Sequence, residues 1–164
     1  RSTHTSPSVE LERIMNFITD FDNDILNDMI SLIEGYERIV LFGYGPSLLC
    51  AQYIEYRLRT TTYKVVIAVV DEVSITSLSD KNTLLIIFTV TGMYRDFKKI
   101  YHNAREKRAK VVIISQHYNT SLIDQCDTVF FLTNEPASQD IIPYEQSRTL
   151  FFIFMEEVIQ GIST

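Results

Sequence analysis

A short apolar run that stops at a pair of glycines constrains this chain more than any other stretch. The run IVLF at 39–42 is followed at once by the segment GYGPS at 43–47, after which a helical pattern begins. Four apolar residues cut off by glycine are typical of a buried strand that ends in a tight turn. Glycine allows such a turn without a Cβ clash, and a helix starting there directs its N–H groups and positive dipole end into it. The stretch therefore predicts an anion-binding turn.

The rest of the chain alternates apolar runs rich in valine and isoleucine with helical patterns. This alternation predicts an α/β fold, a three-layer αβα sandwich whose parallel sheet is covered on both faces. Right-handed crossovers favour the flavodoxin-like strand order 2-1-3-4-5, with two helices before the first strand and one at the C-terminus. Strands are expected at 39–42, 64–70, 83–90, 110–115 and 128–132. Helices are expected at 9–19, 21–35, 47–59, 73–78, 94–108, 121–126 and 144–162.

Length and composition bound the class of protein. With 164 residues the chain predicts one domain, at 9–164, after a polar linker or disordered start at 1–8. A net charge of −6 argues against nucleic-acid binding by this chain alone. No apolar run is long enough for a membrane helix. Cys50 and Cys126 both lie in apolar contexts, so we expect buried free thiols, which suit a reducing cytoplasm.

A second turn is predicted to lie beside the first. In the order 2-1-3-4-5, strands one and three are neighbours at the switch point, where ligands bind outside the carboxyl ends of the strands. The segment after the third strand carries hydroxyls at Thr89 and Thr91, then Gly92 and Tyr94 at the start of a helix. These groups are suited to surround a phosphate. Ser47 in the first turn either caps its helix or contacts the same ligand.

Two common nucleotide motifs fit the first turn poorly. Gly43 and Gly45 match the first two glycines of the dinucleotide fingerprint, but Leu48 stands at the third, and Pro46 removes one backbone donor. No lysine follows the turn as a nucleotide-binding P-loop requires. The sequence therefore disfavours a nicotinamide or nucleotide site.

The two turns together resemble the signatures of the SIS (sugar isomerase) domain, which holds phosphorylated sugars. Its first signature, a strand followed by Gly-x-Gly-x-Ser, is matched by Gly43, Gly45 and Ser47. Its second, a strand followed by Ser-x-Ser-Gly-x-Thr, is matched in part by the segment TVTGMY at 89–94. The resemblance implies these phosphosugar-binding residues: Gly43, Gly45, Ser47, Thr89, Thr91, Gly92 and Tyr94. Tyr94 departs from the family pattern, because a ring that is able to fill the pocket replaces a small hydroxyl.

Within the family, the chain looks most like the C-terminal effector domain of RpiR-type bacterial transcription regulators. The paired helices before the first strand and the closing segment Ser147-Arg148 carry this likeness. It implies a non-catalytic sensor whose sugar phosphate ligand alters DNA binding through a helix-turn-helix domain not present in this chain. Family members pair or form tetramers, so a homodimer or homotetramer is expected. The alternatives are an aldose–ketose isomerase acting on a sugar phosphate, and a degenerate domain that serves only for dimerisation.

An isomerase needs a general base, commonly a glutamate, and often a histidine that opens the sugar ring. No pair of carboxylate and imidazole stands out in the sequence, and we assign no catalytic residue, cofactor or metal site. Further candidates at the ligand edge of the sheet are Ser115, His117, Glu145 and Arg148. The apolar helix at 151–159 serves either the core or a subunit interface.

Overall fold

The chain folds into a parallel sheet between two layers of helices. The computed structural model describes residues 7–162, with side chains from residue 9 onward. Five strands pair in the order β2-β1-β3-β4-β5, all parallel, which confirms the predicted class and topology. The strands are β1 (Arg38–Gly43), β2 (Val65–Ala68), β3 (Thr83–Thr89), β4 (Lys110–Ser115) and β5 (Val129–Phe131).

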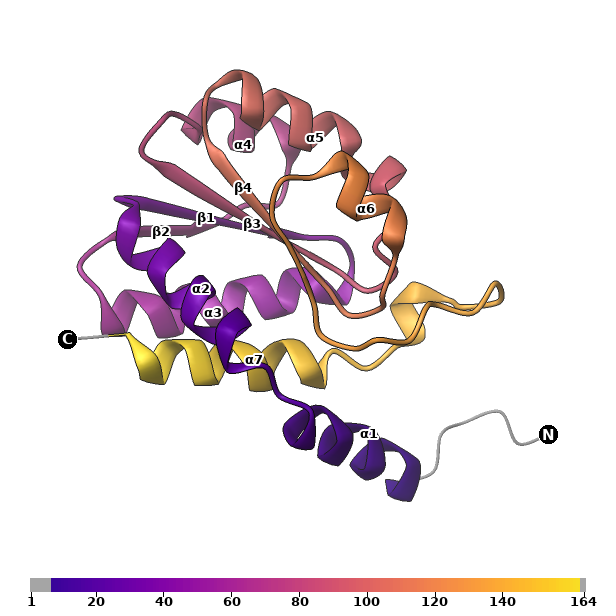
Figure 1. Ribbon diagram of the computed structural model, residues 1–164. Coiled ribbons are helices and arrows are strands. Elements are labelled where there is room, and N and C mark those ends of the chain that lie inside the picture. The colour runs from indigo at the N-terminus through magenta and orange to yellow at the C-terminus, as the bar shows by residue number, and fades with distance from the viewer. Residues whose placement is uncertain (1–6, 163–164) are drawn as a thin grey trace.

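The helices divide between the two faces of the sheet. In Figure 1, α2, α3 and α7 lie below the sheet, α4, α5 and α6 lie above it, and α1 lies beyond one end of α7. The bounds are α1 (Pro7–Thr19), α2 (Asn23–Gly35), α3 (Pro46–Thr61), α4 (Glu72–Leu78), α5 (Tyr94–Glu106), α6 (Thr120–Gln125), the 3₁₀ turn η1 (Pro143–Glu145) and α7 (Thr149–Gly161). Of the linker predicted at 1–8, residues 1–6 lie outside the described residues, and 7 and 8 belong to α1.

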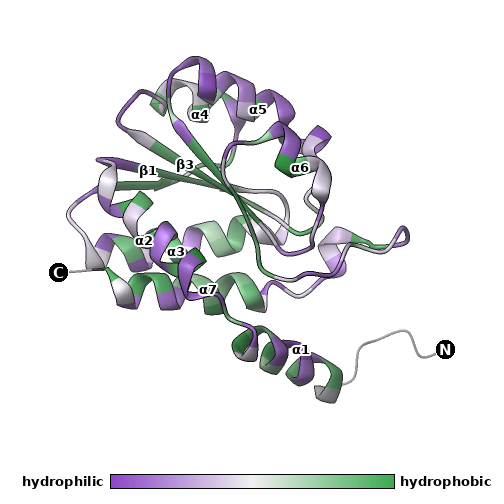
Figure 2. Cartoon of the chain, in the orientation of Figure 1, coloured by the Kyte–Doolittle hydropathy of each residue, from purple (hydrophilic) through white to green (hydrophobic). Residues whose placement is uncertain are grey.

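Alternation along β1 explains why both faces are covered. Ile39 and Leu41 are buried against the layer of α2, α3 and α7, while Val40 and Phe42 are buried in the cluster under α4 and α5. Successive side chains of a strand point to opposite faces, so a strand that is apolar throughout needs a partner layer on each side. Figure 2 shows the apolar strands at the centre and polar residues on the outer faces of the helices.

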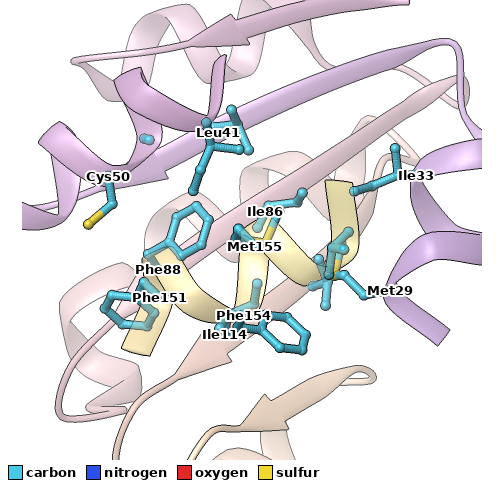
Figure 3. Packing of buried hydrophobic residues seen from close by; sticks show 14 of the residues in the cluster. Met29, Ile33, Leu41, Cys50, Ile86, Phe88, Ile114, Phe151, Phe154 and Met155 are labelled. Carbon is cyan, nitrogen blue, oxygen red and sulfur yellow. The ribbon is translucent and has the colours of Figure 1, made fainter. Parts of the chain in front are cut away.

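The broad apolar surface of α7 is mostly used inside the chain. Phe151, Phe154 and Met155 pack with residues of β1, β3 and α2, as Figure 3 shows. Val158 and Ile159 are buried as well, whereas Phe152 and Ile153 are only partly buried. Core packing therefore accounts for most of this helix, and a subunit interface stays a prediction.

The last helix begins later than its sequence pattern predicts. The pattern places its start at residue 144, but α7 starts at Thr149, and η1 forms a separate turn at Pro143–Glu145. The guanidinium of Arg148 explains the difference, because its Nη1 donates hydrogen bonds to the carbonyls of Pro143 and Gln146. Carbonyls held in this way keep the segment 143–148 outside the regular helix. Glu145 consequently lies in η1 and does not open α7.

The two cysteines are free and buried, as predicted. Burial is the largest cause that raises the pKa of each thiol to about 11, for Cys50 in α3 and for Cys126 after α6. Neither thiol is thus a ready nucleophile at neutral pH. Among the described helices, none has the length and apolar character needed to cross a membrane.

Candidate functional site

The register of the sheet places the two predicted turns side by side. Gly43, the last residue of β1, lies opposite Phe88 of β3, and Thr89 follows directly. The two turns line one pocket of about 230 Å³, which we call the β1–β3 pocket. Its polar and turn residues include Tyr44, Gly45, Ser47, Thr89, Asp96 and Arg148. The prediction that the two turns lie side by side is confirmed.

The first turn directs Ser47 inward. Gly45 is the residue before α3 and has φ 54° and ψ −132°, a conformation that strongly favours glycine. The helix begins at Pro46, so Ser47 lies in the first turn of the helix and does not cap it. A Cβ on Gly43 would lie 2.7 Å from the Ser47 Cβ, which explains why glycine is needed there. Ser47 is only 2% exposed, and its hydroxyl accepts a hydrogen bond of 3.2 Å from Arg148 Nε.

Arg148 is the cation of the β1–β3 pocket. It precedes α7, is buried, and holds the loop at Pro143 through its Nη1 while its Nε reaches Ser47. Burial lowers the pKa of this guanidinium from its ordinary value, yet an arginine remains a cation at neutral pH. Arg148 thus ties the first turn to the last helix and brings a positive charge to the pocket.

In the second turn, the threonine hydroxyls accept hydrogen bonds from backbone N–H groups of the same turn. Thr89 lines the pocket, and its Oγ1 accepts from the Gly92 N–H at 3.1 Å. Thr91 is buried and does not line the pocket, and its Oγ1 accepts from the Met93 N–H at 3.3 Å. Gly92 has φ 71° and faces β4, since a Cβ there would lie 2.8 Å from Ser115 Oγ. Gly92 and Thr91 therefore shape the wall of the pocket from behind.

Tyr94 points away from the pocket. Its ring packs edge-on against Phe97 and Tyr101, at centroid separations of 5.8 and 6.0 Å. Its hydroxyl lies 2.9 Å from His102 Nε2 on the same helix. The ring neither fills the β1–β3 pocket nor lines it, because the first turn of α5 directs it into the core on the α5 side of the sheet.

The helices differ in how their N-termini are capped. Asp22, Asp71 and Asn119 accept backbone N–H groups at the starts of α2, α4 and α6. Among the described residues, no side chain caps α3 or α5, whereas at α7 the Ser147 Oγ accepts from the Thr149 N–H at 3.2 Å. The first turns of α3 and α5 and the residue preceding α7 all contribute lining residues to the β1–β3 pocket. Two positive dipole ends without a capping side chain, those of α3 and α5, thus meet beside Arg148, an arrangement that favours an anion.

Of the four weaker candidates, Arg148 lines the β1–β3 pocket, and the other three lie outside its lining. Ser115 is buried and donates to the carbonyl of His117. His117 lines a second pocket, on the side of α1, and Glu145 is exposed in η1. The fold therefore does not bring Glu145 and His117 together in the β1–β3 pocket. Sequence reasoning missed Asp96, which lines it from α5, and Gln116, a polar residue directly after a buried strand. The position of Gln116 at the ligand edge was the available signal.

Known proteins resemble this chain in sequence family and in fold. The SIS domain family matches residues 32–154, and no curated protein matches the chain. The fold is similar to NanR of Vibrio vulnificus, complexed with ManNAc-6P, with TM-score 0.72 and 15% identity. That match covers 93% of this chain but only 58% of NanR.

Two further solved structures are similar over most of both chains. MJ1247 of Methanococcus jannaschii has TM-score 0.69 and 18% identity over 92% of this chain and 87% of its own. The sugar isomerase domain of an RpiR transcription factor from Sphaerobacter thermophilus has TM-score 0.67 and 12% identity over 90% and 84%. At these identities the likeness concerns the fold, while the family match spans most of the chain. The chain belongs to the SIS domain family.

Proposed function

We propose that the β1–β3 pocket binds a phosphorylated sugar, with the phosphoryl group at the meeting point of α3, α5 and α7. The observation that carries the proposal is the convergence of two helix N-termini without a capping side chain, those of α3 and α5, on a pocket that also holds a buried arginine. Helix N-termini and guanidinium groups are the usual partners of phosphate in proteins. The solved NanR complex, which contains ManNAc-6P, supports a sugar phosphate as the class of ligand.

Each polar group of the pocket has a separate role in this proposal. Arg148 supplies charge, and because Nε and Nη1 are the donors it uses within the fold, Nη2 is the nitrogen it offers to a phosphoryl oxygen. The Ser47 hydroxyl, which accepts from Arg148, donates its own proton to the ligand. Thr89 provides the wall on the β3 side. Of the remaining predicted residues, Gly43, Gly45, Thr91 and Gly92 shape the turns.

We further infer that the domain is a sensor and performs no catalysis. Among the described residues that line the pocket, Asp96 is the one carboxylate and there is no imidazole. A sugar phosphate that binds one subunit arrangement better than another would shift the equilibrium between them, and an attached DNA-binding domain would report that shift. The likeness to NanR and to the Sphaerobacter regulator supports this role.

The rival function is aldose–ketose isomerisation. Its support is the likeness to MJ1247, for which a function as 3-hexulose-6-phosphate isomerase was inferred from the structure. An isomerase needs a base beside the sugar carbons, and Asp96 of the pocket lining is the candidate for that role.

Binding is tested by titrating the protein with hexose 6-phosphates, N-acetylhexosamine 6-phosphates and pentose 5-phosphates, with the unphosphorylated parent sugars and inorganic phosphate as comparisons. We expect thermal stabilisation by at least one sugar phosphate, and larger stabilisation by it than by its parent sugar. Ser47→Ala should weaken that ligand about tenfold to a hundredfold, the usual cost of losing a hydrogen bond to a charged group. Ser31→Ala, on the exposed face of α2, is the matched control and should bind normally. Absence of stabilisation by every sugar phosphate would overturn the proposal.

Catalysis is tested with the ligand that stabilises the protein. Phosphorus NMR of the mixture follows the conversion of an aldose phosphate into its ketose. We expect no ketose phosphate signal to appear, even with one equivalent of protein per ligand. If the protein converts the ligand and Asp96→Asn does not, the domain is an isomerase and not a sensor. The proposal that this pocket binds the sugar phosphate would still stand.

A further inference from the structure

A second pocket, which the proposed function does not use, lies between α1 and the carboxyl ends of β4 and β5. It measures about 350 Å³, and we call it the α1 pocket. Arg13, Asn16 and Phe17 of α1 form one wall, and residues 116–117 and 131–135 form the other. None of the residues that line the β1–β3 pocket lines this one. The two pockets are therefore separate sites.

The floor of the α1 pocket holds a buried amide without a partner. Gln116 is 0% exposed, and neither its Oε1 nor its Nε2 makes a hydrogen bond to any residue in the range 7–162. Its backbone, in contrast, is fixed on both sides. The Gln116 N–H donates to Thr89 O, and its carbonyl accepts from Thr133 N and Oγ1. The side chain is thus presented to the pocket from a position that β3 and the end of β5 hold rigidly.

His117 is a second residue of this pocket with an unpaired atom. Its Nδ1 lies 3.3 Å from the Glu135 carbonyl, which only accepts hydrogen bonds, so Nδ1 carries the proton. Burial lowers the pKa of this imidazole, so the neutral ring presents Nε2 as an acceptor. Nε2 is buried and has no hydrogen-bond partner among the described residues. Arg13 Nε and Nη2, on the facing wall, are also buried and make no hydrogen bond among the described residues, although Nη2 lies 3.4 Å from Glu10 Oε1. An unsatisfied buried polar group costs stability, and three such side chains in one pocket require an explanation.

The charges and the unpaired atoms select the class of ligand. Asp20, Asp22 and Glu135 stand against Arg13 in the lining, so the pocket carries a net negative charge that disfavours a phosphate. Gln116 Oε1 and His117 Nε2 both need donors, which a phosphate dianion lacks, while Gln116 Nε2 and the Arg13 nitrogens Nε and Nη2 need acceptors. A hydroxyl supplies both. Apolar walls for the faces of a sugar ring come from Phe17, Phe21, Phe131 and Phe154.

We propose that the α1 pocket binds an uncharged, hydroxyl-rich small molecule of the class of free monosaccharides. Its hydroxyls bond to Gln116 and His117, and its ring lies against the phenylalanines. Because α1 provides one wall and the sheet the other, the bound molecule joins α1 to the body of the domain. Binding therefore protects the amides of α1 from hydrogen exchange.

The test is a titration of isotope-labelled protein with D-glucose, D-mannose, D-galactose and D-fructose, followed by the side-chain amide signal of Gln116. We expect a saturable shift of that signal with at least one sugar, accompanied by slower hydrogen exchange in α1. The 6-phosphate of the same sugar should leave the signal in place. A Gln116 amide that no sugar moves, or that the phosphate moves equally, would overturn the proposal.

Two variants and a control sharpen the test. Gln116→Met keeps the length of the side chain and removes the unpaired amide, so it should raise the urea midpoint without sugar and weaken sugar binding at least about tenfold. Asn16→Ala changes an exposed residue at the rim and should weaken binding without altering the midpoint. Gln160→Met, on the exposed face of α7, should change neither property.

Unaltered sugar affinity in both Gln116→Met and Asn16→Ala would contradict the assignment. Ser47→Ala separates the two proposals, because it should weaken the sugar phosphate and leave the free sugar unaffected.

Discussion

The turn after β1 and the turn after β3 begin at neighbouring positions of the sheet, but the fold holds them in different ways. The first turn is tied to the far end of the chain through the hydrogen bond from Arg148 to Ser47. The second is tied to the loop before α6, where Asn119 Nδ2 donates to the Gly92 carbonyl at 3.1 Å. Similar residues, glycine with serine or threonine, thus provide a hydroxyl that lines the pocket in the first turn and a wall held by its own hydrogen bonds in the second.

The largest effect is expected for Gly92→Ala, which tests whether the second turn is a structural wall. The new Cβ would meet Ser115 Oγ at 2.8 Å and Leu122 Cδ1 at 3.1 Å, and φ is 71°. Backbone strain and overpacking together should lower the free energy of unfolding by about 3–4 kcal/mol. Urea denaturation measures the change. Gly35→Ala, where a Cβ would meet no described atom within 4 Å, is the control and should be neutral or slightly stabilising.

Gly45→Ala should have a smaller effect in the first turn. Its φ of 54° is strained for alanine, but a Cβ would lie in open space within the described part of the chain. Strain alone should lower the free energy of unfolding by about 1–2 kcal/mol. The same urea experiment measures it. A loss as large as that of Gly92→Ala would show that the first turn is as tightly enclosed as the second, against our comparison.

Thr91→Val separates the two kinds of hydroxyl. It keeps the shape of the side chain and removes the oxygen that accepts from Met93, so stability should fall by about 1 kcal/mol. Calorimetric titration with the stabilising sugar phosphate should give an unchanged affinity, in contrast to Ser47→Ala. If Thr91→Val weakens the ligand as strongly as Ser47→Ala does, the second turn contributes this hydroxyl directly and the comparison fails.

The smallest effect concerns the two thiols. Cys50 of α3, the helix after the first turn, is fully buried, and Cys126, which follows α6, is 6% exposed. Both thiols carry a raised pKa of about 11, so a disulfide reagent should label the native protein slowly. We expect Cys126 to react before Cys50, because the short α6 opens more readily. Single Cys→Ala variants identify the order, and faster labelling of Cys50 would contradict it.

The sequence predicted the sheet and the first turn well because their signals are local. Apolar runs of β length, cut off by Gly43 and Thr89, indicate buried parallel strands whatever surrounds them. The start of α7 was predicted wrongly because Arg148 binds carbonyls in the segment before it, and no local pattern encodes that contact. The direction of the Tyr94 ring was equally hidden, since its core partners Tyr101 and Phe97 are only defined once α5 packs.

What the sequence determined by itself is the α/β class, the strand order and the pair of glycine turns at one edge of the sheet. These follow from periodicity, chirality and the steric freedom of glycine, which act over a few residues. Only the tertiary structure decided which groups share a pocket: it joined Ser47 to Arg148 across the chain and left the buried Gln116 amide facing α1 without a partner among residues 7–162. Such contacts depend on how distant segments pack, because hydrogen-bond partners and burial are properties of the folded whole.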